Sequence, residues 1–165
     1  MELSPDLIDL LRALSDAGVR FLVVGAHAVV YHSEPRYTKD LDLWVELAPD
    51  NVGRLWQALV RFGAPLAHSR PEQFADPMII FQMGVEPNRV DVMMGIDGLE
   101  FSTAWKHRVR TTYGGVAVNV LGRSDLIQAK LASGRPQDLL DVARLQQRPK
   151  GRAPRRSSPK RRRPQ

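Results

Sequence analysis

Three aspartates in this chain of 165 residues occupy positions where aspartate is unusual. Asp42 lies inside the alternating stretch 41–45, and Asp91 lies between apolar neighbours in the stretch 90–94. Both stretches have the pattern of a β-strand, in which aspartate is depleted. Asp40 and Asp42 are two residues apart, so they share one face of their strand. If the two strands are neighbours, three carboxylates meet at one point, and they repel one another unless a cation or a proton lies between them.

Such a group of carboxylates is typical of a site for a hard cation such as Mg²⁺, which leaves coordination positions for water and phosphate oxygens. Each aspartate also has a simpler interpretation. Asp40 is then a loop residue before the strand, Asp42 faces solvent, and Asp91 ends a hairpin. For any one residue the simpler interpretation is the better one, whereas the three together, behind a strand–glycine–helix unit, favour the metal site.

That unit consists of an apolar strand over 21–24, Gly25, and a short helix that begins at Ala26 and runs to residue 31. The N-terminus of a helix offers amide N–H groups and a positive dipole end to an anion. Glycine permits a positive φ and the close approach of a phosphate. Many strand-to-helix turns use a glycine for packing alone, so the significance of Gly25 comes from its position upstream of the aspartate pair.

The remaining pattern predicts alternating helices and strands around these residues. Apolar residues at helical spacing predict five more helices, and short apolar runs predict four more strands. The helices are expected over 5–17, 49–62, 101–107, 124–132 (with Ser124 as its cap) and 136–147, and the further strands over 78–83, 89–94, 109–113 and 116–121. Residues 84–88 and the pair Gly114-Gly115 are typical of hairpin loops. Residues 64–77, which contain three prolines, are expected to be irregular.

Charge is distributed unevenly along the chain. The 24 Lys and Arg exceed the 18 Asp and Glu by six, but nine of the basic residues and none of the acidic ones lie in residues 148–165. Residues 1–147 therefore carry a net charge of −3, and we predict one domain there. The tail 148–165 is too polar to bury a core and is predicted to be disordered. It could bind nucleic-acid phosphates, act as a solvating extension, or attract an acidic partner such as an antitoxin.

Composition also excludes several classes of protein. The chain contains no cysteine, which excludes a disulfide framework, a thiolate nucleophile and cysteine-ligated metal centres. No signal peptide is visible and no apolar stretch approaches the length of a membrane span, so we expect a cytoplasmic protein without membrane contact.

The order of these motifs resembles a known fold. The strand–Gly25-Ala26–helix unit, the segment Thr38-Lys39-Asp40-Leu41-Asp42 and the segment Arg89-Val90-Asp91 resemble the nucleotidyltransferase fold of the DNA-polymerase-β type. More narrowly, the chain is similar to small bacterial nucleotidyltransferase-like proteins related to AbiEii-type toxins. Residues 125–130 and 134–141 match the closing motif of those proteins, which has a Lys, an Arg and two Asp on two helices. The resemblance covers about residues 5–147.

The resemblance implies an α/β (α+β) fold with a central mixed β-sheet flanked by helices and two C-terminal helices. It implies Mg²⁺-dependent transfer of a nucleoside monophosphate from an NTP, with a two-metal site. It assigns Asp40, Asp42 and Asp91 as catalytic and metal-binding residues. The residues that it implies for phosphate binding are Gly25, Ala26, Arg36, Lys130 and Arg135. The superfamily usually has Gly-Gly or Gly-Ser where this chain has Gly25-Ala26, so one phosphate-binding hydroxyl is missing.

Several alternatives stay open at this point. The acceptor could be an RNA, a protein or a small molecule, and the protein could be the toxin of a toxin–antitoxin pair with the antitoxin as partner. Alternatively, the chain could be an inactive nucleotide-binding module, or a nucleic-acid-binding protein that acts through its basic tail. Asp138 and Asp141 share a helix face and are expected to pair with Lys130 or Arg135 rather than to bind metal.

Overall fold

A computed structural model describes residues 3–147 of the chain. The predicted disorder of the tail 148–165 lies outside the described residues. Six strands form one mixed sheet in the order β3-β4-β2-β1-β6-β5. The pairs β1–β2, β3–β4 and β5–β6 are antiparallel, and β1–β6 and β2–β4 are parallel. The strands are β1 (Phe21–Val24), β2 (Asp40–Val45), β3 (Ile80–Met83), β4 (Arg89–Met93), β5 (Val109–Tyr113) and β6 (Val116–Val120).

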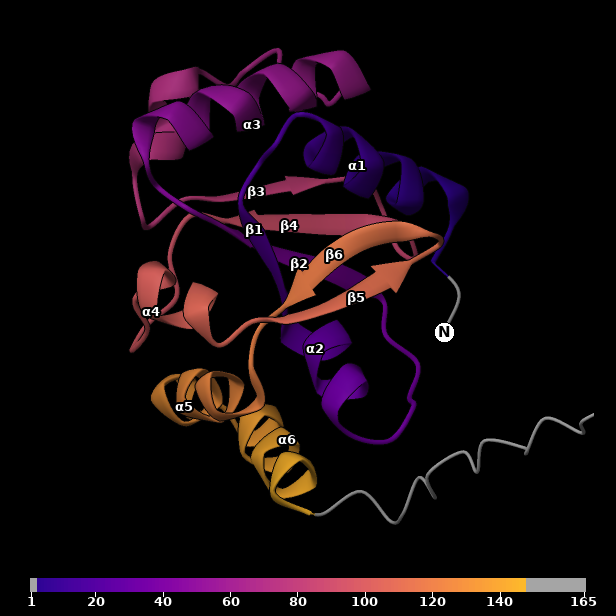
Figure 1. The fold of residues 1–165 in the computed structure, drawn as a ribbon, viewed down its shortest axis with the longest axis vertical. Coiled ribbons are helices and arrows are strands. Elements are labelled where there is room, and N and C mark those ends of the chain that lie inside the picture. Colours follow the sequence, from indigo (N-terminus) through magenta and orange to yellow (C-terminus); the bar gives the residue numbers. More distant parts are fainter. Residues whose placement is uncertain (1–2, 148–165) are drawn as a thin grey trace, which may run out of the picture.

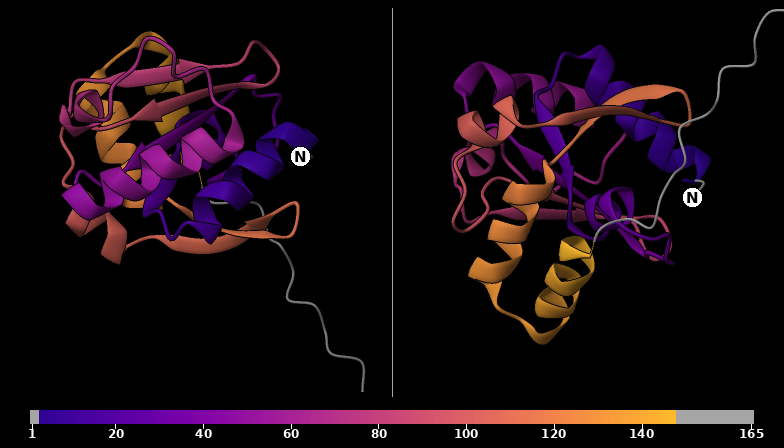
Figure 2. Two further views of the ribbon diagram at one scale, coloured as in Figure 1. Left: turned by 90° about the horizontal axis from the view of Figure 1, so that it is seen from above. Right: turned by 60° about the horizontal axis from the view of Figure 1, so that its bottom comes forward.

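Helices cover both faces of this sheet, as the α/β prediction requires. Helices α1 and α3 lie on one face, whereas α2, α5 and α6 lie on the other, and α4 lies near one end (Figure 1). Helices α5 and α6 pack side by side, which Figure 2 shows from a second direction. The helices are α1 (Pro5–Asp16), α2 (Gly25–His32), α3 (Pro49–Phe62), α4 (Phe101–Lys106), α5 (Arg123–Ser133) and α6 (Pro136–Gln146).

Local sequence explains where these elements begin and which face they bury. The Ser4 hydroxyl accepts a hydrogen bond from the Leu7 amide, and Pro5 fills the first turn, so α1 starts where its cap allows. The leucines of α1 recur at helical spacing and are buried. In β2, Leu41 and Leu43 are fully buried on the face opposite Asp40 and Asp42. The alternation therefore directs the aspartates toward the side of the sheet that carries α2.

The structure corrects two details of the prediction. Residues 64–77 are not wholly irregular, because Pro71–Ala75 form a short 3₁₀-helix, η1, that buries Phe74. Ser124 does not cap α5, since the cap is Gly122 and Ser124 lies within the first turn. None of the helices within residues 3–147 is long and apolar enough to cross a membrane.

Candidate active site

The register of the central strands brings the predicted carboxylates together on one face. Strands β2 and β4 are parallel neighbours, and Asp42 lies directly beside Asp91. Paired residues of adjacent strands project to the same face of a sheet, and Asp40 shares that face because it lies two residues before Asp42. The sequence could predict the common face of Asp40 and Asp42. The pairing with Asp91 depends on the fold.

Gly25 lies against this group of carboxylates. Its φ is +59°, a left-handed conformation that favours glycine. A Cβ atom at this position would overlap the Asp42 carboxylate. The chain thus turns from β1 into α2 with Gly25 close against Asp42, and Gly25 and Ala26 are the first residues of α2. The structure places the turn where an anion held near Asp42 would meet a helix N-terminus.

Asp42 has an unusual protonation equilibrium. Burial is the main cause that raises the pKa of Asp42 to about 7, and the neighbouring charges of Asp91 and Asp40 raise it further. The more distant cations Lys130 and Arg89 oppose this rise. The site therefore concentrates negative charge that the protein itself compensates only in part.

Asp40 has a buried polar atom that is unsatisfied. Its Oδ1 atom is buried and has no hydrogen-bond partner among the described residues. A buried carboxylate oxygen without a partner loses its hydration without compensation, which costs about 1–3 kcal/mol or more for a charged group. Such an atom is a natural ligand for a cation that enters from solvent.

Asp91, in contrast, is already paired. Arg89 lies two residues earlier on the same face, and its Nε and Nη2 atoms lie 3.0 and 3.1 Å from the two oxygens of Asp91. Gln82 on β3 donates a weaker bond at 3.4 Å. Residues 3–147 contain no group of three or more acidic or histidine side chains arranged to hold a metal ion. The sequence analysis missed this ion pair, although the Arg-x-Asp spacing on a strand was its signal.

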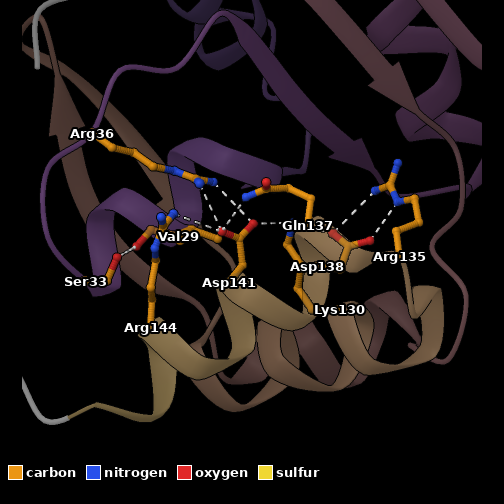
Figure 3. Close-up of polar contacts among 9 residues, drawn as sticks. All are labelled: Val29, Ser33, Arg36, Lys130, Arg135, Gln137, Asp138, Asp141 and Arg144. Atoms are coloured by element: carbon orange, nitrogen blue, oxygen red, sulfur yellow. Dashed lines mark hydrogen bonds and ion pairs between the residues drawn. The ribbon is translucent and has the colours of Figure 1, made fainter.

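The predicted phosphate-binding cations gather around two buried aspartates of α6 (Figure 3). Lys130 Nζ lies 2.8 Å from Asp138 and 3.0 Å from Asp141, and Arg135 Nε lies 2.6 Å from Asp138. Burial alone would raise the pKa of Asp138, but hydrogen bonds from Arg135, Lys130 and Ser133 bring it down to about 2. The expected pairing of the two aspartates with Lys130 and Arg135 is confirmed.

Arg36 joins the same cluster from the loop that precedes β2. Its two terminal nitrogens lie 3.0 and 3.2 Å from the oxygens of Asp141, a bidentate pair between residues 105 positions apart. Arg144 lies 3.5 Å from the same carboxylate. The cluster thus holds four cationic side chains against two carboxylates, and it influences the charge of Asp42 through Lys130. We call these six residues the α6 ion cluster: Arg36, Lys130, Arg135, Asp138, Asp141 and Arg144.

The chain is similar in fold to several solved protein structures. Neither a protein-family model nor a curated protein sequence matches the chain. A candidate nucleotidyltransferase from Thermotoga maritima superposes with a TM-score of 0.56 at 17% identity, over 83% of this chain and 88% of that one. An antigenic nucleotidyltransferase-like protein from Paracoccidioides brasiliensis gives 0.54 at 15% identity, over 88% and 78% of the two chains. The chain has the nucleotidyltransferase fold.

A third structure extends the comparison. The lincosamide antibiotic adenylyltransferase LnuA, with lincomycin bound, superposes with a TM-score of 0.51 at 14% identity, over 87% of this chain and 96% of LnuA. At these identities the similarity concerns the fold. The comparisons bear out the predicted fold, and the narrower similarity to AbiEii-type proteins stays a prediction.

Proposed function

We propose that this chain is a Mg²⁺-dependent nucleotidyltransferase that moves a nucleoside monophosphate from an NTP to a hydroxyl group of an acceptor. The observation that supports it most strongly is the placement of Asp42 beside Asp91, with the Gly25 backbone in contact with Asp42. A carboxylate pair next to a helix N-terminus binds divalent cations and phosphates together.

The carboxylates fit a divalent cation. Asp40 has a buried oxygen without a hydrogen-bond partner in the described part of the chain, and burial and like charges raise the pKa of Asp42. A cation would satisfy both residues, with Asp91 as the third ligand once Arg89 moves away. Bound Mg²⁺ supplies electrostatic stabilisation of the triphosphate and favours ionisation of the acceptor hydroxyl.

The cations of the α6 ion cluster supply the phosphate contacts in this proposal. The positive charges of Lys130 and Arg135 interact with the Asp42 carboxylate. Arg135 has 74% of its side chain exposed, so it can reach a ligand without leaving a buried position. Arg36, on the loop before β2, would bind an outer phosphate. The amides of Gly25 and Ala26 complete the phosphate site.

The reaction is a displacement at the α-phosphorus. The acceptor oxygen forms a bond to this phosphorus while the bond to the oxygen that bridges to the β-phosphate breaks, and pyrophosphate leaves. The hydroxyl proton passes to the Asp91 carboxylate and then to solvent. Such transfers depend on positioning and charge stabilisation rather than on a covalent nucleophile of the protein.

The biological role rests on the narrower resemblance. A toxin of a toxin–antitoxin pair that modifies an RNA or a protein is consistent with the AbiEii-like motifs, and an antitoxin would then be its partner in the cytoplasm. LnuA, which has the same fold, binds the small-molecule antibiotic lincomycin. This supports small molecules as the class of acceptor.

A second candidate is a nucleotide-binding module that performs no transfer. Two observations favour it: Ala26 replaces the usual glycine or serine, and Arg89 occupies the Asp91 carboxylate. Both functions predict Mg²⁺-dependent binding of an NTP, and they differ in whether the labelled nucleotide is transferred.

The experiment that separates them uses each α-labelled NTP with Mg²⁺, the full chain and a cell extract from which nucleotides have been removed. Transfer of label by the wild type, with loss in Asp42→Ala, supports the enzyme. Binding without transfer supports the module. If neither the wild type nor Asp42→Ala binds an NTP, both proposals are wrong.

A further inference from the structure

A second row of side chains lies on the same sheet face as the carboxylates. The register pairs Asp42 with Asp91 and Asp91 with Gln82. Two residues further along the strands, it pairs Trp44 with Met93 and Met93 with Ile80. At about 3.3 Å per residue, this apolar row lies about 7 Å from the carboxylates. A molecule that reacts at Asp91 therefore extends over an apolar surface if it continues in this direction.

Trp44 and Ile80, at the two ends of this row, line a cavity of about 440 Å³. Its walls include Trp44, Ile80 and Phe101, and the rings of Trp44 and Phe101 pack edge to face at 5.1 Å. Ile80 and Met78, also in its walls, are 54% and 82% exposed. Exposed apolar side chains that border a cavity of this size are typical of a small-molecule site.

The charged residues that line this cavity are all acidic. Asp97 and Glu100 line it, whereas none of the described residues that line it is Lys, Arg or His. Carboxylates at the rim repel the phosphates of a nucleic acid and attract an ammonium group. The cavity thus differs from the phosphate side of the site, where four cations surround Asp138 and Asp141.

The geometry of the displacement determines on which side of the α-phosphorus the acceptor lies. In an in-line displacement, the attacking oxygen and the leaving pyrophosphate lie on opposite sides of the α-phosphorus. In the proposed function the phosphates bind at Gly25 and Lys130, on the side of β1 and α5. The acceptor hydroxyl therefore approaches from the side of β4 and β3, where Met93 and Ile80 lie.

We infer that the acceptor is a small amino alcohol with an aromatic or branched aliphatic group, bound against Trp44, Ile80 and Phe101 with its ammonium group toward Asp97 and Glu100. This inference rests on the proposed function. The acceptor oxygen forms the new bond to the α-phosphorus, pyrophosphate leaves, and the hydroxyl proton passes to Asp91. A nucleic acid or a protein is disfavoured as acceptor.

The test measures label transfer from α-labelled ATP by the full chain to two kinds of acceptor. One is a panel of aromatic and branched amino alcohols that includes 2-amino-3-phenylpropan-1-ol. The other is a 20-nucleotide RNA with a free 3′-hydroxyl. Ile80→Lys places a cation in the cavity, and Val60→Lys is its matched control because Val60 is also 54% exposed but belongs to α3, on the other face. Mg²⁺-dependent ATP binding by each variant is measured separately, which reports both its folding and the nucleotide site.

We expect transfer to the amino alcohols, a KM for the amino alcohol raised at least tenfold in Ile80→Lys, and no change in Val60→Lys or in ATP binding. The double variant Asp97→Asn, Glu100→Gln should raise the KM for amino alcohols several-fold and leave the KM of the matching neutral alcohols unchanged. Transfer to RNA alone, or a rise in the KM for ATP rather than for the acceptor in Ile80→Lys, overturns the inference while the proposed function stands. Failure of the wild type to bind any NTP overturns both.

Discussion

Asp42 makes the site sensitive to pH at the scale of single residues. Its folded-state pKa of about 7 lies above the ordinary value of 3.8, so between about pH 4 and 7 the folded chain binds more protons than the unfolded chain. The raised pKa adds to the free energy of unfolding. This contribution is fully present below pH 4 and is lost as the pH rises through 7. Without metal, the wild type should lose about 2 kcal/mol relative to Asp42→Asn between pH 5 and 8.

Urea unfolding of both proteins in EDTA, at pH values from 5 to 8, measures this difference. Added Mg²⁺ should stabilise the wild type and leave Asp42→Asn unchanged. Parallel stability profiles of the two proteins in EDTA would show that folding does not raise the pKa of Asp42.

Arg89 competes with a metal ion for Asp91. Its guanidinium binds both Asp91 oxygens, and a cation that takes Asp91 as ligand must displace it. Arg89→Gln should therefore lower the Mg²⁺ concentration that half-saturates ATP binding by about two- to fivefold. Lys39→Gln is the matched control, because Lys39 is a nearby cation that pairs with Glu86 instead. A higher Mg²⁺ requirement in Arg89→Gln would mean that Arg89 helps to bind the nucleotide.

Sequence reasoning works well for residues that are close in the chain. The common face of Asp40 and Asp42 follows from their spacing, and so does the pairing of Lys130 and Arg135 with the aspartates that follow. Arg36 reaches Asp141 across 105 positions, and no local pattern indicates that contact. The apolar row that contains Ile80 was likewise invisible, because it depends on which strands are neighbours.

At the scale of elements, the turn from β1 into α2 brings Gly25 against Asp42 and so shapes the candidate site. Gly25→Ala should cost the ordinary strain of a positive φ, about 1–2 kcal/mol, plus the overlap of the new Cβ with the Asp42 carboxylate. Gly115→Ala isolates the first cost, since Gly115 has a φ of +79° and nothing within 4 Å of its would-be Cβ. We expect Gly25→Ala to be the less stable variant in thermal unfolding and to lose ATP binding. Equal stabilities would show that Asp42 moves aside freely.

The α6 ion cluster connects α5 and α6 to the loop before β2. Asp141 is 1% exposed and forms ion pairs with Lys130, Arg36 and Arg144. Asp141→Asn therefore leaves buried or half-buried cations without their anionic partner. We expect a loss of about 3 kcal/mol in the free energy of unfolding. Asp50→Asn, which removes an exposed pair with Arg54 within one helix, should change it by less than about 0.5 kcal/mol. Similar effects of the two substitutions would show that the cluster contributes little to folding.

For elements, the sequence predicted the six strands and six helices within a few residues. The strand alternation and helical spacing that carry these predictions are local properties. Strand order is a long-range property and was not predicted, since the resemblance to a known fold implied only a central mixed sheet. The short helix η1 was missed because prolines dominate its neighbourhood, although Phe74 was the signal of a buried segment.

At the scale of the whole molecule, charge is divided between a body with a net charge of −3 and a tail with nine basic residues. If the tail binds nucleic acid, a chain truncated after residue 147 should bind RNA at least tenfold more weakly at 50 mM salt, and the binding of the full chain should fall steeply with salt. The same truncation should leave Mg²⁺-dependent ATP binding unchanged. Fluorescence anisotropy with a labelled RNA measures the first effect, and RNA binding that survives truncation would place it on the body.

The central claim is that Asp40, Asp42 and Asp91 together form a binding site for a divalent cation beside Gly25. The most direct measurement is a crystal structure with Mn²⁺ and an ATP analogue that cannot be cleaved between the α- and β-phosphates, because Mn²⁺ scatters anomalously. We predict an anomalous peak between the carboxylates of Asp42 and Asp91, with Arg89 moved away and the triphosphate against the start of α2. A nucleotide bound elsewhere, or an Arg89–Asp91 pair that stays intact with no peak beside it, would contradict the account.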